Sequence, residues 1–320
     1  MSGAPIFIVG CPRSGTSLLR DLLRADPELS IPPESYFIPS FFRAWGDPGS
    51  AAEARALAAR ILSMRPVKRW QLQLNPGDFE PCRSFVAVLD RLYGEFAARE
   101  GASRWGDKTP SYVLELPLLS GLFPEARFVH IHRDPRDVAL SWLEMRFGPG
   151  NVFGAATAWK RFVATGRRDG ASLGDRYMEV RYETLLTEPE AVMRSVCEFT
   201  QVPFTSALLR RAEVGPVYAK DSQHLERILS RAEIDEANAF GWRRRMRLAD
   251  QAVVEAVAGD TLSELGYERE GSPRRIPRLS RVALATDDAV RSAIKRARYR
   301  QFTLRNAALV GRAELLGRLR

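Results

Sequence analysis

Residues 10–17, GCPRSGTS, follow the apolar run PIFIV and have the residue types of a phosphate-binding loop. A glycine turn between a strand and a helix points backbone N–H groups at one anion, and the helix N-terminus adds partial positive charge. The frame G-x-x-x-x-G-K-[ST] is matched except that Thr16 replaces the lysine that reaches β- and γ-phosphates. Arg13 and the hydroxyls of Ser14, Thr16 and Ser17 remain to hold an anion. We therefore predict a phosphate loop; the alternative is an ordinary α/β connection with a solvated Arg13.

A second polar motif, HIHRDPRDVALSW, again places polar groups where a strand leads into a helix. Arg133 ends the strand, and Ser141 follows about two helical turns later. An arginine fork with a hydroxyl suits a second anionic group, such as a separate phosphate. The alternative is an exposed helix start in which Asp134 and Asp137 pair with Arg136. Two phosphate-type motifs without a Walker lysine favour a nucleotide that carries both a 3′- and a 5′-phosphate.

Strands alternating with helices must position these two motifs. Strands are expected at residues 5–9, 126–132 and 177–185. Helices are expected at residues 16–25, 51–63, 84–99, 110–124, 134–147, 188–200 and 249–265. The alternation predicts an α/β protein, with a P-loop-like three-layer fold in which helices flank a mostly parallel central sheet.

The charge of the chain is concentrated near its C-terminus. The 320 residues include 48 Lys+Arg and 39 Asp+Glu, a formal net charge of +9, but 13 of the basic and 3 of the acidic residues lie in 272–320. The rest is nearly neutral, so we expect no nucleic-acid binding. We predict a catalytic domain over 1–271 and a basic helical extension over 272–320. The extension either contacts an anionic membrane surface peripherally or packs on the body.

Cysteine and histidine are too scarce and too scattered for a typical metal site. Three cysteines and three histidines occur without C-x-x-C or Cys/His spacing, which predicts a reducing compartment and no metal. Neither a run of ~18 apolar residues nor a signal peptide is evident. We therefore expect a cytoplasmic protein, with membrane contact confined to the basic extension.

The two phosphate motifs resemble those of sulfotransferases that use 3′-phosphoadenosine 5′-phosphosulfate (PAPS). VGCPRSGTSLLRDLL resembles their 5′-phosphosulfate loop and FVHIHRDPRDVALSW their 3′-phosphate motif; WGDKTPSYV, VRYETLLTEPEAVMRSVCEFTQVPF and FGWRRRM follow in the family's order. The resemblance covers roughly residues 5–268 and is nearer to the bacterial and tyrosylprotein-sulfotransferase branch than to the cytosolic steroid and phenol enzymes. It implies Arg13 as the contact to the 5′-phosphosulfate. The other phosphate-binding residues that it implies are Ser14, Gly15, Thr16, Ser17, Arg133 and Ser141.

Three further assignments follow from the resemblance. Tyr182 lies where this branch has a tyrosine near the adenine, although packing at a strand end explains it equally well. Lys108 matches a lysine near the transferring sulfonate; its alternative is a surface lysine paired with Asp107. The family often has a basic residue before the tryptophan of its C-terminal motif, but here that residue is Gly241. The 3′-phosphate contact is then expected from the arginines that follow, namely Arg243, Arg244 or Arg245.

Glu34 is the predicted general base. In the tyrosylprotein branch a glutamate shortly after the first helix takes the acceptor's proton, and IPPESYFIP occupies that place here. A partly desolvated carboxylate beside the cofactor would have a raised pKa. The cytosolic branch uses a histidine where this chain has Pro110. His132, beside Arg133, competes for the role, but strand alternation favours a structural or phosphate-side position.

The resemblance thus implies a transferase that moves a sulfuryl group from PAPS, leaving 3′,5′-ADP, to a hydroxyl without a metal. The acceptor would be a small molecule, a carbohydrate (glycan), a lipid or a peptide. Aromatic residues of segment 36–100 are expected to line the acceptor site, namely Tyr36, Phe37, Trp45 and Trp70. The alternatives are a P-loop-type kinase and a non-catalytic nucleotide-binding homologue.

Overall fold

The computed structural model describes residues 3–210, 238–270 and 275–317, with 300–317 as backbone only. It divides into two compact units, which are described separately. Unit 1 comprises Met1–Arg133 and Phe162–Ala239, and unit 2 comprises Asp134–Arg161 and Phe240–Arg320. The predicted boundary at residue 271 falls inside unit 2 and stays a prediction.

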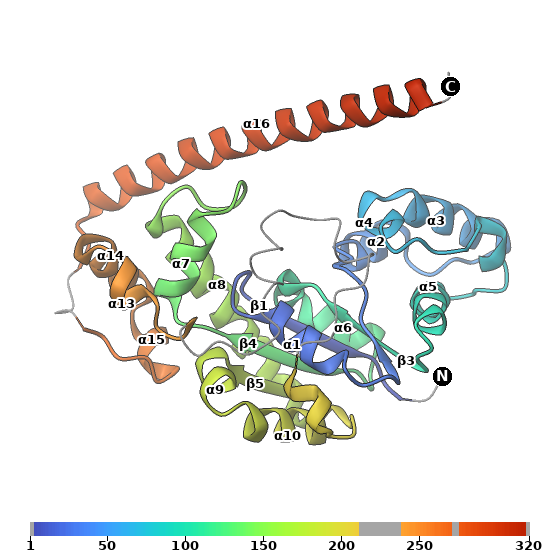
Figure 1. Ribbon diagram of the computed structural model, residues 1–320, viewed down its shortest axis with the longest axis horizontal. Helices are drawn as coiled ribbons and strands as arrows, with labels where there is room; N and C mark the ends of the chain where they lie inside the picture. Colours follow the sequence, from blue (N-terminus) through green and yellow to red (C-terminus); the bar gives the residue numbers. More distant parts are fainter. Residues whose placement is uncertain (1–2, 211–237, 271–274, 318–320) are drawn as a thin grey trace. The chain divides into compact units, whose positions relative to one another are not determined.

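Unit 1 is built around a five-stranded, all-parallel sheet (Figure 1). Its strands are β1 (Ile6–Gly10), β2 (Leu29–Ser30), β3 (Arg104–Lys108), β4 (Arg127–His132) and β5 (Tyr177–Arg181). They run in the order β2-β3-β1-β4-β5, so the loop after the first strand starts from the middle of the sheet. The predicted α/β architecture with a parallel sheet flanked by helices is confirmed.

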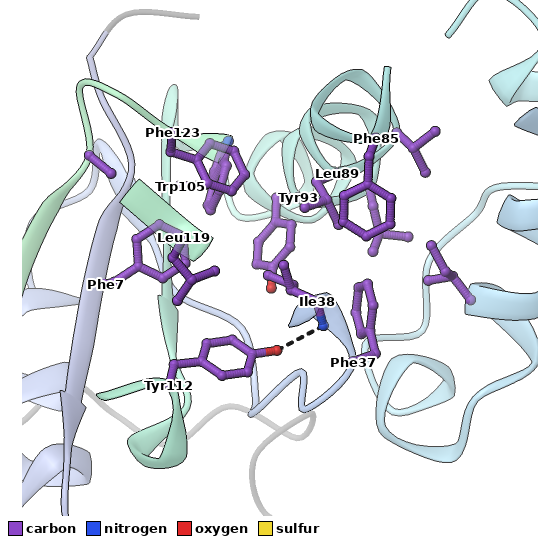
Figure 2. Close-up of a cluster of buried hydrophobic side chains, with 14 of the residues drawn as sticks. Phe7, Phe37, Ile38, Phe85, Leu89, Tyr93, Trp105, Tyr112, Leu119 and Phe123 are labelled. Atoms are coloured by element: carbon purple, nitrogen blue, oxygen red, sulfur yellow. Dashed lines mark hydrogen bonds between the residues drawn. The ribbon is translucent and has the colours of Figure 1, made fainter. Parts of the chain in front are cut away.

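Side chains of the central strand alternate between two hydrophobic layers, as the period of two in a strand requires. Ile6 and Ile8 pack with α1 (Thr16–Leu23), α9 (Tyr182–Thr187) and α10 (Pro189–Thr200). Phe7 and Val9 pack on the opposite side of the sheet. That larger cluster is rich in aromatic rings (Figure 2). A strand buried on both faces has no polar side to expose, which accounts for its continuous apolar run.

The aromatic layer is supplied mainly by helices that lie between β2 and β4 in the chain. They are α2 (Ile38–Trp45), α3 (Ala51–Ser63), α4 (Arg65–Lys68), η1 (Pro76–Phe79), α5 (Phe85–Arg99), η2 (Pro110–Glu115) and α6 (Leu116–Leu122). In the described part of unit 1 the remaining helices are η3 (Ala171–Arg176), η4 (Ser206–Leu209) and the second half of α8 (Val152–Gly170). The predicted helices at 51–63 and 84–99 are confirmed.

Several features differ from the sequence prediction. Strand β2 and helix α8 were not expected, and the predicted helix 134–147 ends at Leu143. Strand β3 was not expected, because RWGDK is mostly polar. The predicted strand 177–185 ends at Arg181, where α9 begins, and the predicted helix 110–124 begins as the 3₁₀ turn η2. The predicted helix 249–265 is interrupted at Gly259, whose φ of 57° is left-handed.

Unit 2 is held by a buried ion cluster. Its helices are α7 (Pro135–Leu143), the first half of α8, α13 (Trp242–Arg245), α14 (Leu248–Ala258), α15 (Asp260–Glu264) and α16 (Arg278–Gly317). Arg136 is almost fully buried and bonds Asp134 at 2.7 Å and Glu255 at 2.8 Å, with its guanidinium 3.6 Å from the Trp242 ring. The expected pairing of Asp134 with Arg136 therefore exists, but it is buried rather than exposed. Among helices in the described part of the chain, none has the length and apolar composition needed to cross a membrane.

Candidate functional site

Each of the five parallel strands leads into a predicted site residue at its carboxyl end. The loop with Arg13 follows β1, Lys108 ends β3, Arg133 follows β4 and Tyr182 follows β5. Glu34 comes four residues after β2. Parallel strands end along one edge of the sheet, which is where α/β proteins bind ligands. The topology therefore gathers residues that are up to 169 positions apart in the chain.

The loop after β1 has the conformation of an anion cradle. Arg13 and Gly15 both have positive φ, at 77° and 97°, and the Ser14 amide closes a tight turn on the Cys11 carbonyl at 3.1 Å. Helix α1 starts at Thr16 with no side chain capping it. The Ser14 hydroxyl is buried and has no hydrogen-bond partner within the described residues. A buried donor and uncapped helix amides fit a bound phosphate.

Tyr182 links this loop to Arg133. A Cβ atom placed on Gly15 would lie 2.2 Å from Tyr182 Cδ2, so only glycine lets the loop lie against the ring. The Arg133 guanidinium lies 4.4 Å from the centroid of the same ring and donates to the Asn238 carbonyl at 2.9 Å. Tyr182 also belongs to the hydrophobic cluster on this side of the sheet. It therefore packs at the strand end and borders both predicted phosphate contacts.

Lys108 pairs with the predicted base. Its ammonium donates to Glu34 Oε1 and to the Ser17 hydroxyl at 3.3 Å, and its side chain is only 3% exposed. Asp107 points elsewhere and accepts from the Tyr93 hydroxyl at 2.6 Å. The alternative of a surface lysine paired with Asp107 is therefore wrong. Lys108 connects the candidate base to the anion loop.

Hydrogen bonds to its neighbours hold the Glu34 segment in place. The Ser35 hydroxyl bonds the Tyr112 hydroxyl at 2.7 Å. The Tyr112 hydroxyl also accepts from the Ile38 amide at 3.0 Å, the bond drawn in Figure 2. The Trp70 indole donates to the Pro33 carbonyl at 3.0 Å. The backbone on both sides of Glu34 is thus hydrogen-bonded to buried aromatic residues. These bonds fix the position of the segment that carries the Glu34 carboxylate.

Tyr36, one of the aromatic residues expected to line the acceptor site, also contacts the candidate base, which the sequence analysis did not predict. Its hydroxyl donates to Glu34 Oε2, its backbone has a φ of 59°, and the residue is 54% exposed. A left-handed aromatic residue is a strained conformation, which is typical of functional sites. The available signal was weak, namely a phenol two residues after a carboxylate. Of the other aromatics proposed for the acceptor site, Trp45 is exposed, whereas Phe37 and Trp70 are core residues.

The expectation of a raised Glu34 pKa is wrong. Burial acts to raise the pKa of Glu34, but the charge and hydrogen bond of Lys108, the hydroxyl of Tyr36 and the charge of Arg20 together lower it. Burial in turn lowers the pKa of Lys108 despite the attraction of Glu34. Glu34 is therefore ionised at neutral pH, ready to accept a proton but held by its partners. Arg20, which bonds Asp21 at 2.6 Å, is a second contributor that sequence reasoning missed.

His132 is buried near the end of β4. Burial, followed by the charges of Arg181 and Arg167, lowers the pKa of His132 to about 4. Its neighbour His130 bonds the Tyr177 hydroxyl at 2.6 Å, and burial lowers the pKa of His130 to about 3. Both imidazoles are neutral at physiological pH and belong to the interior of unit 1, as strand alternation suggested for His132.

Comparison with known proteins decides the family. The model of a sulfotransferase family matches residues 5–206, which include the loop, Glu34, Lys108, Arg133 and Tyr182. The chain belongs to the sulfotransferase family. The expected resemblance is thereby confirmed, and the protein is a sulfotransferase enzyme.

Named relatives and one solved structure agree with this membership. The sulfotransferase is 25% identical over 288 residues to protein-tyrosine sulfotransferase 1 of Danio rerio, covering 84% of this chain and 73% of the relative. It is 26% identical over 292 residues to nodulation protein NoeE of Sinorhizobium fredii, covering 82% of this chain and 66% of the relative. The sulfotransferase domain from the curacin biosynthetic pathway superposes with a TM-score of 0.59 at 25% identity, over 83% of this chain and 98% of that domain.

The remaining predicted donor contacts of this sulfotransferase lie in unit 2. Ser141 is on α7, and the three candidate arginines form α13. Arg243 bonds Glu270 at 2.7 Å, Arg245 pairs with Glu144, and Arg244 is exposed. The assignment of Ser141, Arg243 and Arg244 to the 3′-phosphate stays a prediction. Within the described residues no three acidic, histidine or cysteine side chains form a metal-binding group, and the metal-free reaction likewise stays a prediction.

Proposed function

We propose that this sulfotransferase moves a sulfuryl group from PAPS to an acceptor hydroxyl, with Glu34 as the general base. The observation that carries the proposal is the position of Lys108, whose ammonium contacts both Glu34 and Ser17. This contact joins a carboxylate that can take a proton to a loop that can hold an anion. Base and electrostatic stabiliser must lie this close for in-line transfer to an oxygen nucleophile.

The loop and Arg133 fit the two ends of a 3′,5′-bisphosphorylated nucleotide. The amides of α1 and the buried Ser14 hydroxyl would hold a 5′-phosphate, and Arg133 would take the 3′-phosphate. Tyr182 offers a ring between them. PAPS, when bound, supplies the sulfuryl group and leaves as 3′,5′-ADP. Thr16, at the Walker lysine position, cannot reach a γ-phosphate as that lysine does, which argues against a kinase.

Glu34, Lys108 and Arg13 have separable tasks. Glu34 accepts the proton of the acceptor hydroxyl while the oxygen of that hydroxyl forms a bond to sulfur. Lys108 and Arg13 offset negative charge as the bond between sulfur and the phosphate oxygen breaks. Tyr36 already donates a phenolic hydrogen bond to Glu34, so a hydroxyl can occupy this position. An acceptor hydroxyl would replace that hydrogen bond.

The acceptor is a small molecule, a glycan, a lipid or a peptide that presents a hydroxyl. The Danio rerio relative is named for protein tyrosine and the Sinorhizobium fredii relative for nodulation. The exposed phenol of Tyr36 beside the base supports an acceptor that tolerates an aromatic neighbour.

Calorimetry with two nucleotides tests the donor. We expect 3′,5′-ADP to bind without added metal, and ATP with Mg²⁺ to bind at least tenfold more weakly. Incubation with ³⁵S-labelled PAPS and a panel of phenols, sugars, peptides and lipid alcohols should then yield a labelled product. Tighter binding of ATP with Mg²⁺ and transfer of a labelled phosphoryl group would overturn the proposal.

A further inference from the structure

The C-terminal helix α16 is attached to the rest of unit 2 through one polar face. Its first half meets the segment 143–151 through hydrogen bonds of 2.6 to 3.2 Å. The bonded pairs are Gly150 N with Asp288 Oδ1, Asn151 Nδ2 with Leu284 O and Asp287 Oδ2, Ser292 Oγ with Gly148 O, and Lys295 Nζ with Leu143 O and Pro149 O. The contact is close, because a Cβ on Gly150 would lie 2.8 Å from the Asp288 carbonyl oxygen. Leu284, Asp288, Ser292 and Lys295 recur every three or four residues and share one side of the helix, and Asp287 lies at the edge of that side.

The opposite side of α16 exposes apolar side chains. Leu279, Val282, Val290 and Ile294 are 86%, 65%, 53% and 45% exposed, and exposed alanines lie between them. At 3.6 residues per turn these four positions fall within about one third of the helix circumference. We call this set the apolar face. Figure 1 shows the helix that carries it as one continuous segment.

Positive charge borders the apolar face. Arg278, Arg296 and Arg298 are exposed at positions next to this face. The two acidic residues between 278 and 299, Asp287 and Asp288, are hydrogen-bonded to the segment 143–151. The described side chains therefore place cations, without acidic partners, beside the exposed apolar residues. Apolar positions flanked by arginine are typical of helices that lie in the plane of a membrane surface.

The charge pattern selects the occupant of this face. A second copy of the helix would bring one row of arginines toward another, and the two aspartates between 278 and 299 are already bonded to Gly150, Asn151 and Arg291. An anionic bilayer offers acyl chains to the apolar face and phosphate groups to the arginines. The polar groups of the opposite face are already hydrogen-bonded to segment 143–151. The apolar face can therefore contact lipid without loss of those hydrogen bonds.

We propose that α16 is a membrane-surface helix that lies on anionic lipid through Leu279, Val282, Val290 and Ile294. Arg278, Arg296 and Arg298 contact lipid phosphates. The hydrogen bonds from Asn151, Ser292 and Lys295 hold unit 2 against the bilayer. The proposal is independent of the donor and of the acceptor.

Co-sedimentation of the full chain with vesicles tests the proposal. We expect binding to phosphatidylcholine vesicles that contain about one third phosphatidylserine, and at least tenfold weaker binding to pure phosphatidylcholine. Raising the salt from about 50 mM to about 500 mM should weaken the binding, because surface charge is screened. Equal binding to both vesicles, or none to either, would overturn the proposal.

Paired variants separate the apolar face from general surface effects. Val290→Ser with Ile294→Ser should lower vesicle binding at least tenfold, while circular dichroism and the melting temperature change little. The matched control is Leu248→Ser with Ala285→Ser, which changes an exposed leucine elsewhere in unit 2 and an alanine off the apolar face. Equal binding by the two double variants would contradict the proposal. Sedimentation velocity provides the remaining outcome: a dimer that only Val290→Ser with Ile294→Ser dissociates, with vesicle binding unchanged, would assign the face to a second copy.

Discussion

The ammonium of Lys108 and the carboxylate of Glu34 form a largely buried ion pair, although 74 residues separate them in the chain. Lys108 ends the central-sheet strand β3, and Glu34 lies in the segment that follows β2. Because β2 and β3 are neighbouring parallel strands, the pairing is a direct consequence of strand order. The pair keeps Glu34 ionised and holds it beside the anion loop.

Replacing Glu34 by glutamine removes the proton acceptor and keeps the shape. General-base catalysis contributes roughly 10²- to 10⁴-fold, so we expect kcat with PAPS to fall by that factor. Calorimetric binding of 3′,5′-ADP should be preserved, because the loop and Arg133 remain. Glu80→Gln, an exposed carboxylate paired with Arg55, is the control and should leave kcat unchanged. Near-normal turnover of Glu34→Gln would remove Glu34 from the mechanism.

Lys108→Met should change the pH profile as well as the rate. Without the charge of Lys108, burial dominates and the pKa of Glu34 rises. The acid limb of kcat/KM, which reports ionised Glu34, should therefore move to higher pH than in the wild type. The exposed Lys68→Met is the matched control and should leave the limb in place. An unshifted limb in Lys108→Met would mean that the limb reports another group.

Gly15→Ala tests the contact between the loop and Tyr182. The added Cβ would lie 2.2 Å from Tyr182, and the backbone of residue 15 has a positive φ of 97°, which strains an alanine. Gly101→Ala has a similar φ of 78° but nothing within 4 Å, so it carries the backbone strain alone, about 1–2 kcal/mol. We expect Gly15→Ala to bind 3′,5′-ADP at least tenfold more weakly, and Gly101→Ala to bind it normally. If both variants bound it equally well, the close approach would be irrelevant to the donor.

Arg136→Met tests the buried ion cluster of unit 2. The variant leaves Asp134 and Glu255 buried without their cation, which typically costs about 3–5 kcal/mol. Arg247→Met removes an exposed partner of Asp250 and should cost at most about 1 kcal/mol. Urea unfolding monitored by intrinsic tryptophan fluorescence measures both. A small effect of Arg136→Met would show that the two carboxylates find other partners or protons.

The two buried histidines predict acid sensitivity. Between pH 6.5 and about 4 the unfolded chain protonates both imidazoles, whereas folded His130 and His132 stay neutral because their pKa values are lowered. The unfolded state then binds more protons, so the free energy of unfolding falls as pH falls, by about 1 kcal/mol per pH unit for each histidine. Thermal melting of the wild type and His130→Gln over this range measures the effect. The glutamine variant should lose stability more gradually on acidification, and parallel curves would contradict the assignment.

The sequence by itself determined the local parts of this protein. The run PIFIV, the turn GCPRSGTS and the helix after it were predicted because strand hydrophobicity, glycine and helix periodicity act over neighbouring residues. The same holds for β4 and α5, and for the motifs that revealed the family. Strand β3 escaped prediction because its charged residues are buried only by distant partners: Arg104 bonds the carbonyls of Ala4 and Thr200, and Lys108 bonds Glu34.

Tertiary structure alone decided how those parts act on one another. Strand order brings Lys108 to Glu34, and this contact lowers the pKa of Glu34. Reasoning from burial alone had predicted a raised pKa. The tertiary structure also brings the Tyr36 hydroxyl into contact with Glu34 and buries Phe37 and Trp70 in the core. In α16 the periodicity indicated an amphipathic helix, but the bonds to segment 143–151 decide which face is covered. Desolvation and charge depend on distances through space, and spacing along the chain does not specify them.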